Sequence, residues 1–201
     1  DAGLPVDIFA SLPCRYWTKY TILNIHKLGK TFQLTVEKGR EMSLNMLANF
    51  RTVALFIKKH GGSTGFEWPR FCLGHQLPEI AQLIQELEWL TSKPDGCELG
   101  VKSIRQETLD MPIKKPWIVY TDCPGLAQRL DAKKCTHQQH APCEGQDTAH
   151  TGFYTQEFAE IIVAAFRRHR GCRTKAALVA SEPGALTDHD SKHTTSSPPC
   201  H

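Results

Sequence analysis

The sequence lacks any apolar stretch that approaches the roughly 20 residues needed to span a bilayer, and no signal-peptide pattern opens it. We therefore expect no membrane partner and an intracellular location, in the nucleus or the cytoplasm. A strong excess of one charge is also missing, because 24 Lys and Arg residues are balanced by 21 Asp and Glu residues, for a net charge of +3. Strongly basic nucleic-acid binders carry larger and more clustered excesses, so the charge alone does not indicate that class.

The sequence also lacks the pattern of a disulfide-stapled domain. Its eight cysteines are scattered through 201 residues, a length that buries a core without covalent cross-links. We therefore expect reduced thiols. The chain begins at Asp1 and reaches an apolar run almost at once, which is typical of a processed fragment or of a segment of a longer polypeptide.

Short apolar runs alternate with segments of helical periodicity. The pattern predicts strands over 6–10, 65–68 and 117–121, a further candidate strand over 97–101, and helices over 46–57, 78–87, 124–130 and 156–168. This alternation predicts an α/β domain over residues 1–170, with a mostly parallel sheet flanked by helices. From residue 171 onward Ser, Thr, Pro and His dominate, so we expect residues 171–201 to form a disordered C-terminal tail.

Two polar residues stand where the first two predicted strands end. Cys14 follows the run 6–10, and Glu67 lies near the end of the strand 65–68. Parallel strands deliver such residues to one edge of a sheet, where open α/β sheets bind ligands. A cysteine beside a carboxylate can act as a nucleophile. The alternatives are a small buried apolar role for Cys14 and an ion pair between Glu67 and Arg70 or a nearby lysine.

Basic and aromatic residues interleave after Cys14, a pattern that holds single-stranded nucleic acid through phosphate contacts and base stacking. Further basic residues follow Glu67 and precede the strand 117–121. The candidate nucleic-acid-binding residues are Arg15, Tyr16, Trp17, Lys19, Arg70, Lys114 and Lys115. Equally, the aromatic side chains can belong to the core and the lysines to a solvated face.

Two cysteines and two histidines lie close together in the loop 135–143. Cys135, His137, His140 and Cys143 are all residue types that bind zinc tetrahedrally. Their spacing is tighter than in common zinc fingers, so His150 or Cys123 can replace one ligand, and a polar loop without metal is the alternative. If zinc binds, four protein ligands make its role structural.

Pro13-Cys14 after a strand resembles the Pro-Cys motif of the cytosine-C5 DNA methyltransferases, and Phe66-Glu67-Trp68-Pro69 resembles their Glu-Asn-Val motif. The resemblance implies a partial Rossmann-like, methyltransferase-like fold. It also implies that Cys14 is the nucleophile that attacks C6 of cytosine and that Glu67 engages the N3 and N4 edge of the flipped base. Lys114 and Lys115 occupy the place of the family's basic motif. In the order of its short motifs, the chain also resembles retroelement-type polyproteins of dinoflagellate-like protists.

The glycine-rich loop and the acidic residue that build the family's cofactor site have no counterpart in this sequence, and Trp68 replaces the family's asparagine. S-adenosylmethionine is therefore expected only if an upstream half is present. Two functions follow. The first is a degenerate, non-catalytic methyltransferase-like module of a mobile-element polyprotein that binds nucleic acid or another part of that polyprotein. The second is a cytosine-C5 methyltransferase fragment that uses Cys14 and Glu67.

Overall fold

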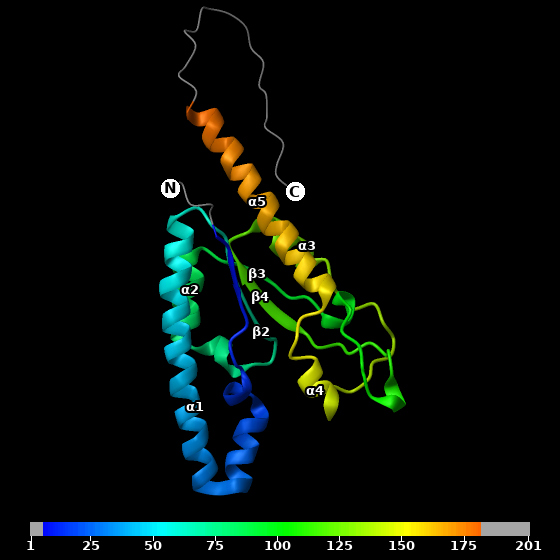
Figure 1. Cartoon of the computed structure of the whole chain (residues 1–201). Helices are drawn as coiled ribbons and strands as arrows, with labels where there is room; N and C mark the ends of the chain where they lie inside the picture. Colours follow the sequence, from blue (N-terminus) through cyan, green and yellow to red (C-terminus); the bar gives the residue numbers. More distant parts are fainter. Residues whose placement is uncertain (1–5, 182–201) are drawn as a thin grey trace, which may run out of the picture.

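The structure is a computed structural model and describes residues 6–181, with side chains as far as residue 172. A four-stranded sheet lies between two layers of helices (Figure 1). Its strands follow the order β1-β2-β4-β3 across the sheet. Their bounds are β1 Ile8–Ala10, β2 Thr64–Pro69, β3 Leu90–Ser92 and β4 Trp117–Thr121. The predicted α/β class with flanking helices is confirmed.

The sheet is mixed, so the predicted mostly parallel arrangement is wrong. β1 pairs with β2 in parallel, whereas β4 pairs antiparallel with both β2 and β3. The physical reason lies in β4, whose side chains are buried or half-buried along its whole length. A strand covered on both faces has the same apolar pattern in either direction. The Rossmann-like assignment stays a prediction.

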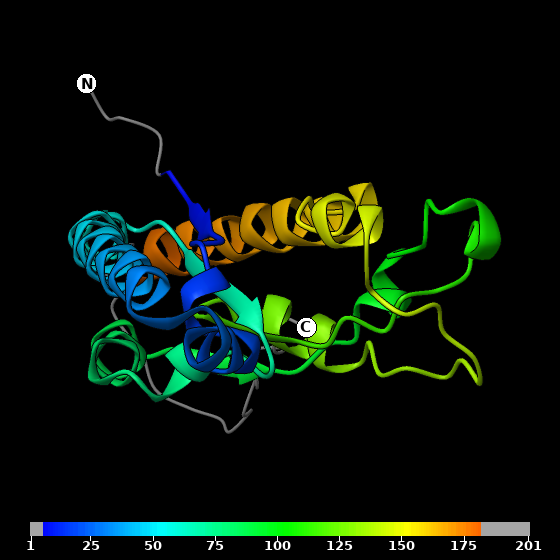
Figure 2. The same ribbon diagram turned by 90° about the horizontal axis from the view of Figure 1, so that it is seen from below.

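Five α-helices complete the described part of the chain, together with four short 3-10 turns. They are α1 Lys19–Lys59, α2 Pro78–Leu87, α3 Pro124–Asp131, α4 Gln146–His150 and α5 Gln156–Ser181, with turns η1 Arg15–Trp17, η2 Leu73–Gln76, η3 Gly96–Leu99 and η4 Gln106–Thr108. α1 and α2 cover one side of the sheet, and α3 and α5 cover the other (Figures 1 and 2).

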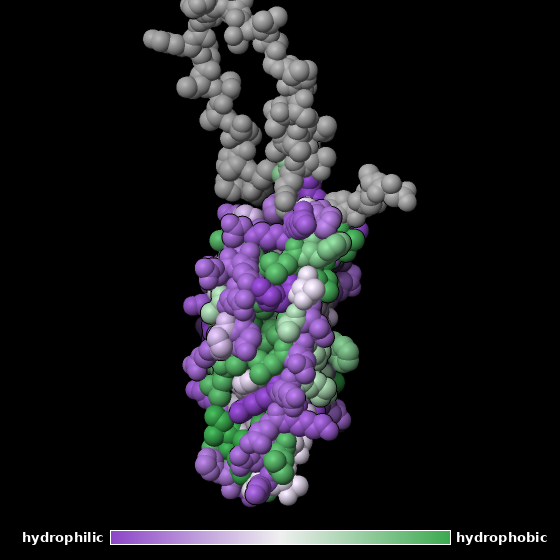
Figure 3. Space-filling view, turned by 90° about the vertical axis from the view of Figure 1, so that its left-hand side faces the viewer, coloured by the Kyte–Doolittle hydropathy of each residue, from purple (hydrophilic) through white to green (hydrophobic). Residues whose placement is uncertain are grey.

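The first helix is much longer than predicted and folds back on itself. Gly29 interrupts it with φ 73° and ψ −161°, a backbone region that is essentially restricted to glycine. The chain reverses there, so a short arm descends and a long arm returns along the sheet (Figure 1). Apolar side chains of the long arm also reach the surface, among them Met42, Val53 and Phe56, and Figure 3 shows apolar patches between polar side chains on this side of the molecule.

Each face of the sheet carries its own apolar core. On the α1–α2 side, Phe66 and Trp68 of β2 are fully buried, with Phe50 of α1 against Phe66. On the α3–α5 side, Trp117 of β4 stacks on Phe158 of α5 with ring centroids 5.1 Å apart. Side chains of a strand alternate between faces, so Glu67, which lies between Phe66 and Trp68, points to the α5 side.

The candidate strand over 97–101 is instead the 3-10 turn η3. Cys97, Leu99 and Val101 are buried and alternate with less buried neighbours, which imitates the period of a strand. Gly100, with φ 81°, ends the turn in a left-handed conformation that a strand does not allow. The edge strand β3 was not predicted, because two of its three residues are exposed and no apolar run marks it.

The C-terminal helix continues past the predicted boundary at residue 171 and ends at Ser181. The rest of the predicted disordered tail, residues 182–201, lies outside the described residues. Among residues 6–181 no helix combines the length and apolar character needed to cross a membrane. Six cysteines of this part are free thiols, as expected, whereas Cys172 is disulfide-bonded.

Candidate functional site

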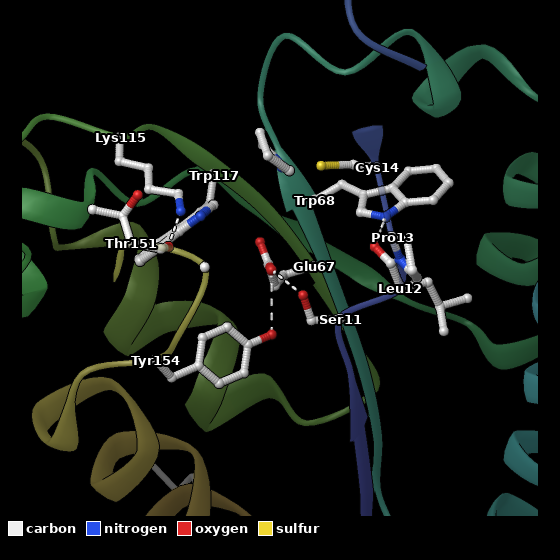
Figure 4. Close-up of a pocket in the computed structure, with 12 residues that line it drawn as sticks. Ser11, Leu12, Pro13, Cys14, Glu67, Trp68, Lys115, Trp117, Thr151 and Tyr154 are labelled. Carbon is white, nitrogen blue, oxygen red and sulfur yellow. Dashed lines mark hydrogen bonds between the residues drawn. The ribbon is translucent and has the colours of Figure 1, made fainter. Parts of the chain in front are cut away.

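A pocket of about 270 Å³ opens where β1 and β2 end. Because these strands are parallel neighbours, their carboxyl ends meet at one edge of the sheet. The segment before β4 and the loop between α4 and α5 close the other sides (Figure 4). The lining residues are Ser11, Leu12, Pro13, Cys14, Glu67, Trp68, Pro69, Lys115, Trp117, Thr151, Gly152 and Tyr154.

The structure brings Cys14 and Glu67 into this one pocket, as their positions after β1 and in β2 predict. In Figure 4 the sulfur of Cys14 and the carboxylate of Glu67 point into the same space, and the Lys115 side chain approaches from the opposite wall. The indole of Trp68 turns away and donates a hydrogen bond to the carbonyl oxygen of Leu12 at 2.7 Å, which holds the segment leading to Cys14. The chemical roles of Cys14 and Glu67 stay predictions.

Glu67 is a buried acid, and the protein supplies hydrogen-bond partners to only one of its two carboxylate oxygens. Its side chain is 4% exposed. Oε1 accepts hydrogen bonds from the Ser11 hydroxyl at 2.7 Å and the Tyr154 hydroxyl at 3.3 Å, whereas Oε2 is buried without a partner. Burial raises the pKa of Glu67, and the hydroxyl of Ser11 and the charge of Lys115 oppose that rise. A buried acceptor without a partner costs about 1–3 kcal/mol.

Cys14 is half-buried, and its surroundings favour the neutral thiol. Burial raises the pKa of Cys14, and the nearby carboxylate of Glu67 raises it further. Lys115 lowers it by less than burial raises it. Because the thiolate is the nucleophilic form of cysteine, this environment weakens Cys14 as a nucleophile.

Lys115 has a strained backbone and a side chain that is already bound. Its φ is 28°, a conformation that costs a non-glycine residue about 1–3 kcal/mol and that clusters at functional sites. Its ammonium donates a hydrogen bond to the carbonyl oxygen of Thr151. Burial lowers the pKa of Lys115. The backbone N–H of Gly96 donates to the Lys115 carbonyl oxygen at 3.1 Å, which ties this residue to η3.

Four of the residues predicted to bind nucleic acid follow Cys14 closely in the sequence, and they differ in how far they are exposed. Arg15 and Lys19 are exposed. Trp17 is buried, and its indole donates a hydrogen bond to the Ser43 hydroxyl at 3.0 Å. The ring of Tyr16 lies against Gly39 of α1. Trp17 therefore has the structural role that the alternative interpretation assigned to it, and Tyr16 packs against α1.

The three later basic residues also differ in their surroundings. Lys114 is exposed, and Lys115 lines the pocket. The guanidinium of Arg70 lies 3.2 Å from the Asp95 carboxylate and donates to the carbonyl oxygens of Lys93 and Pro94. Arg70 is therefore half-buried and held by these partners, and a phosphate contact by it stays a prediction.

A second candidate centre differs from the predicted metal loop by one residue. Cys97, Cys135, His137 and His140 place one potential ligand atom each within 4.8 Å of one another, so this cluster could hold a metal ion. Cys143 is not in the cluster. It is exposed, and its sulfur lies 3.4 Å from the Thr151 hydroxyl. The cluster therefore differs from the predicted set at this ligand and contains neither of the substitutes considered for it, His150 and Cys123. Which residues bind a metal stays a prediction.

Sequence reasoning missed Cys97, Ser11 and Tyr154. Cys97 lies 38 residues before Cys135, and no spacing rule joins two ligands so far apart. Tyr154 reaches Glu67 across 87 residues, again without a local signal. Ser11 lies in the same segment as Cys14, and only the direction of its side chain shows that it belongs to the site.

No protein-family model, curated protein or solved structure matches this chain.

Proposed function

We propose that this protein is a nucleic-acid-binding module whose pocket, lined by Cys14 and Glu67, receives a single base and does not transfer a methyl group. The observation that carries the proposal is the unpartnered Oε2 of Glu67, buried at the end of β2 beside the pocket. In the proposal, a ligand supplies the missing partner. An ionised Oε2 accepts a hydrogen bond from an exocyclic amino group, and a protonated one donates to a ring nitrogen.

The walls of the pocket suit a flat, aromatic ligand. Pro13, Pro69 and Trp117 supply apolar surface, while the polar groups concentrate at Glu67 and Lys115. Binding sites for small ligands commonly combine apolar walls with a few placed polar groups. A nucleobase has this chemistry, with two apolar faces and a hydrogen-bonding edge, and enzymes that take up a base read that edge after the base has left its stack.

The surface beside the pocket suits the rest of a single strand. Cys14 and Pro69 also line a second, more apolar hollow of about 350 Å³, which Tyr20 and Phe71 border. The side chains of Tyr20 and Phe71 are 77% and 69% exposed. Exposed aromatic rings stack neighbouring bases, and the adjacent Lys19 contributes positive charge for the phosphates.

The state of Cys14 favours binding over catalysis. Burial and the Glu67 carboxylate both raise the pKa of its thiol, so the nucleophilic thiolate is scarce. The proposed protein is therefore a degenerate methyltransferase-like module of a mobile-element polyprotein, with nucleic acid or another part of that polyprotein as its partner. An intracellular location fits this proposal.

A cytosine-C5 methyltransferase fragment is the second candidate function, and the presence of Cys14 and Glu67 in one pocket favours it. Cys14 would attack C6 of the base while Glu67 binds the N3 and N4 edge. S-adenosylmethionine would have to come from an upstream half. An oligonucleotide with a mechanism-based cytosine analogue separates the two functions. A covalent adduct that Cys14→Ser abolishes supports the enzyme, and no adduct in the wild type supports the binding module.

The binding proposal is tested by fluorescence anisotropy with a labelled, short abasic DNA strand, with or without one central cytosine. Loss of a hydrogen bond to a charged or buried partner costs about 1.5–3 kcal/mol, which is about a 10–100-fold change in affinity. The wild type should prefer the cytosine strand by that factor, and Glu67→Gln should reduce the preference. Glu86→Gln is the matched control, because Glu86 lies in α2, pairs with Arg51 of α1 and does not line the pocket. Equal wild-type affinity for both strands contradicts the proposal.

A further inference from the structure

The four side chains of the Cys97 cluster come from two segments that are far apart in the sequence. Cys97 lies in η3, and Cys135, His137 and His140 lie in the loop that follows α3. Two sulfurs and two imidazole nitrogens are the donor set of a closed structural zinc site. We infer that these four residues bind one zinc ion, with Cys97 as the fourth ligand in place of Cys143, and that the ion cross-links η3 to the loop 133–143.

The distances within the cluster are close to those of a zinc site. With Zn–S bonds of about 2.3 Å and Zn–N bonds of about 2.0–2.1 Å, the ligand atoms of a tetrahedron lie about 3.3–3.8 Å apart. In the structure the four ligand atoms all lie within 4.8 Å of one another, and the Cys135 sulfur is 3.1 Å from Nε2 of His140. Side-chain adjustments of a few tenths of an ångström up to about an ångström therefore produce the tetrahedron.

A carboxylate outside the cluster already orients one of the histidines. Nδ1 of His137 lies 3.1 Å from Oε1 of Glu98, the residue that follows Cys97. The same oxygen accepts hydrogen bonds from the backbone N–H of Thr136 at 2.9 Å and from its hydroxyl at 3.0 Å. A hydrogen bond from Nδ1 leaves Nε2 as the nitrogen with a free lone pair, which is how carboxylates support histidine ligands of zinc.

The backbone already holds the two segments together without the ion. Asp95, next to η3, donates its N–H to the carbonyl oxygen of Lys133 at 2.8 Å, and its carboxylate accepts the N–H of Cys135 at 3.0 Å. Metal binding therefore has to order only the part of the loop that carries His137 and His140. Cys143 lies outside the cluster, beside Thr151.

The donor set also indicates which metal binds. Soft thiolates with imidazoles in a closed four-ligand site select zinc over the hard cations calcium and magnesium, which take oxygen ligands. Two thiolates and two neutral imidazoles balance the charge of Zn²⁺. Because the protein fills all four positions, the ion stabilises the fold and does not activate a water molecule.

The test is the zinc content of the protein, purified under reducing conditions, in two matched cysteine variants. We expect stoichiometric zinc in the wild type and in Cys143→Ser, and its loss from Cys97→Ser. Because Cys97 is buried, His140→Ala provides a second variant on the half-buried side of the cluster. It should lose zinc while its far-ultraviolet circular dichroism at low temperature stays near that of the wild type. Cobalt substitution should give the charge-transfer and visible bands of a tetrahedral site with two thiolates.

Three results would overturn the inference. The first is sub-stoichiometric zinc in the reduced wild type. The second is zinc that Cys143→Ser removes and Cys97→Ser retains, which would restore the ligand set predicted from the loop alone. The third is a disulfide between Cys97 and Cys135 in protein purified with reductant, seen by mass spectrometry. The outcome does not depend on the base-binding pocket, because zinc is measured without any nucleic acid.

Discussion

Replacing Glu67 by glutamine should stabilise the protein, and more so at high pH. Burial raises the pKa of Glu67 in the folded state above its value in the unfolded chain. The folded protein therefore holds this proton to a higher pH than the unfolded protein does, and the wild type loses stability as the pH rises between the two pKa values. Below the unfolded pKa, near 4.5, the acid is neutral in both states and the two proteins should be equally stable.

The magnitude follows from the surroundings of the two carboxylate oxygens. Glutamine keeps an oxygen for the hydroxyls of Ser11 and Tyr154 and places a neutral amide where Oε2 lies unpartnered. The amide nitrogen would lack a partner as Oε2 does, so the cost of an unpartnered buried group is common to both proteins. At pH 8 the variant avoids the extra cost of burying an ionised group in place of a neutral one, and we expect Glu67→Gln to gain on the order of 1–2 kcal/mol. With a urea m-value of about 2 kcal/mol/M, its midpoint rises by about 0.5–1 M.

The measurement is urea unfolding followed by tryptophan fluorescence between pH 4.5 and pH 8. Cys14, Lys115 and Tyr154 are the other titratable groups that face Glu67. Because both proteins contain them, the difference in unfolding free energy between variant and wild type at each pH removes the part of their contributions that the two proteins share. Glu86→Gln is the control with the opposite sign. Its ion pair with Arg51 holds the pKa of Glu86 below its usual value. This variant should therefore be less stable than the wild type by about the same amount throughout the measured range, because the wild type loses the contribution of Glu86 only below the unfolded pKa near 4.5. A Glu67→Gln effect that does not vary with pH refutes the reasoning.

Two further predictions concern glycines. Gly29→Ala should cost about 1–3 kcal/mol, because alanine strains the reversal inside α1, and Gly125→Ala, where nothing lies within 4 Å of an added methyl group, should be neutral or stabilising in thermal unfolding. Gly74→Ala should cost about 1–3 kcal/mol in urea unfolding, because its methyl group would lie 2.4 Å from the buried ring of Trp68. Wild-type stability in either Gly29→Ala or Gly74→Ala contradicts the corresponding prediction.

The parts of the fold that depend on local pattern could be predicted from the sequence. The runs that became β2 and β4 are rich in aromatic and β-branched residues, which favour strands, and α2 begins at Pro78, a residue that favours the first turn of a helix. The placement of Cys14 and Glu67 in one pocket followed from a single parallel pair of strands. β1 and β2 form the only parallel pair in the described sheet. The prediction of a shared pocket required only this pair, and the pair was predicted correctly.

What could not be predicted depends on contacts between distant segments. Nothing in the residues of β4 records that its direction is opposite to that of β2, since both strands are buried on both faces. The alternation of Cys97, Leu99 and Val101 arose from a 3-10 turn and a left-handed glycine. For the same reason, Cys97 could not be recognised as a companion of Cys135 until the fold placed η3 against the loop.

The hydrogen bond between the N–H of Gly96 and the carbonyl oxygen of Lys115 has a thermodynamic consequence. It places a neighbour of Cys97, the proposed zinc ligand, in direct contact with Lys115, which lines the Glu67 pocket. If zinc changes the affinity of the pocket for its ligand by some factor, linkage requires that the ligand change the affinity for zinc by the same factor. A titration of either one in the presence and absence of the other therefore measures a single coupling free energy, and the two titrations must agree.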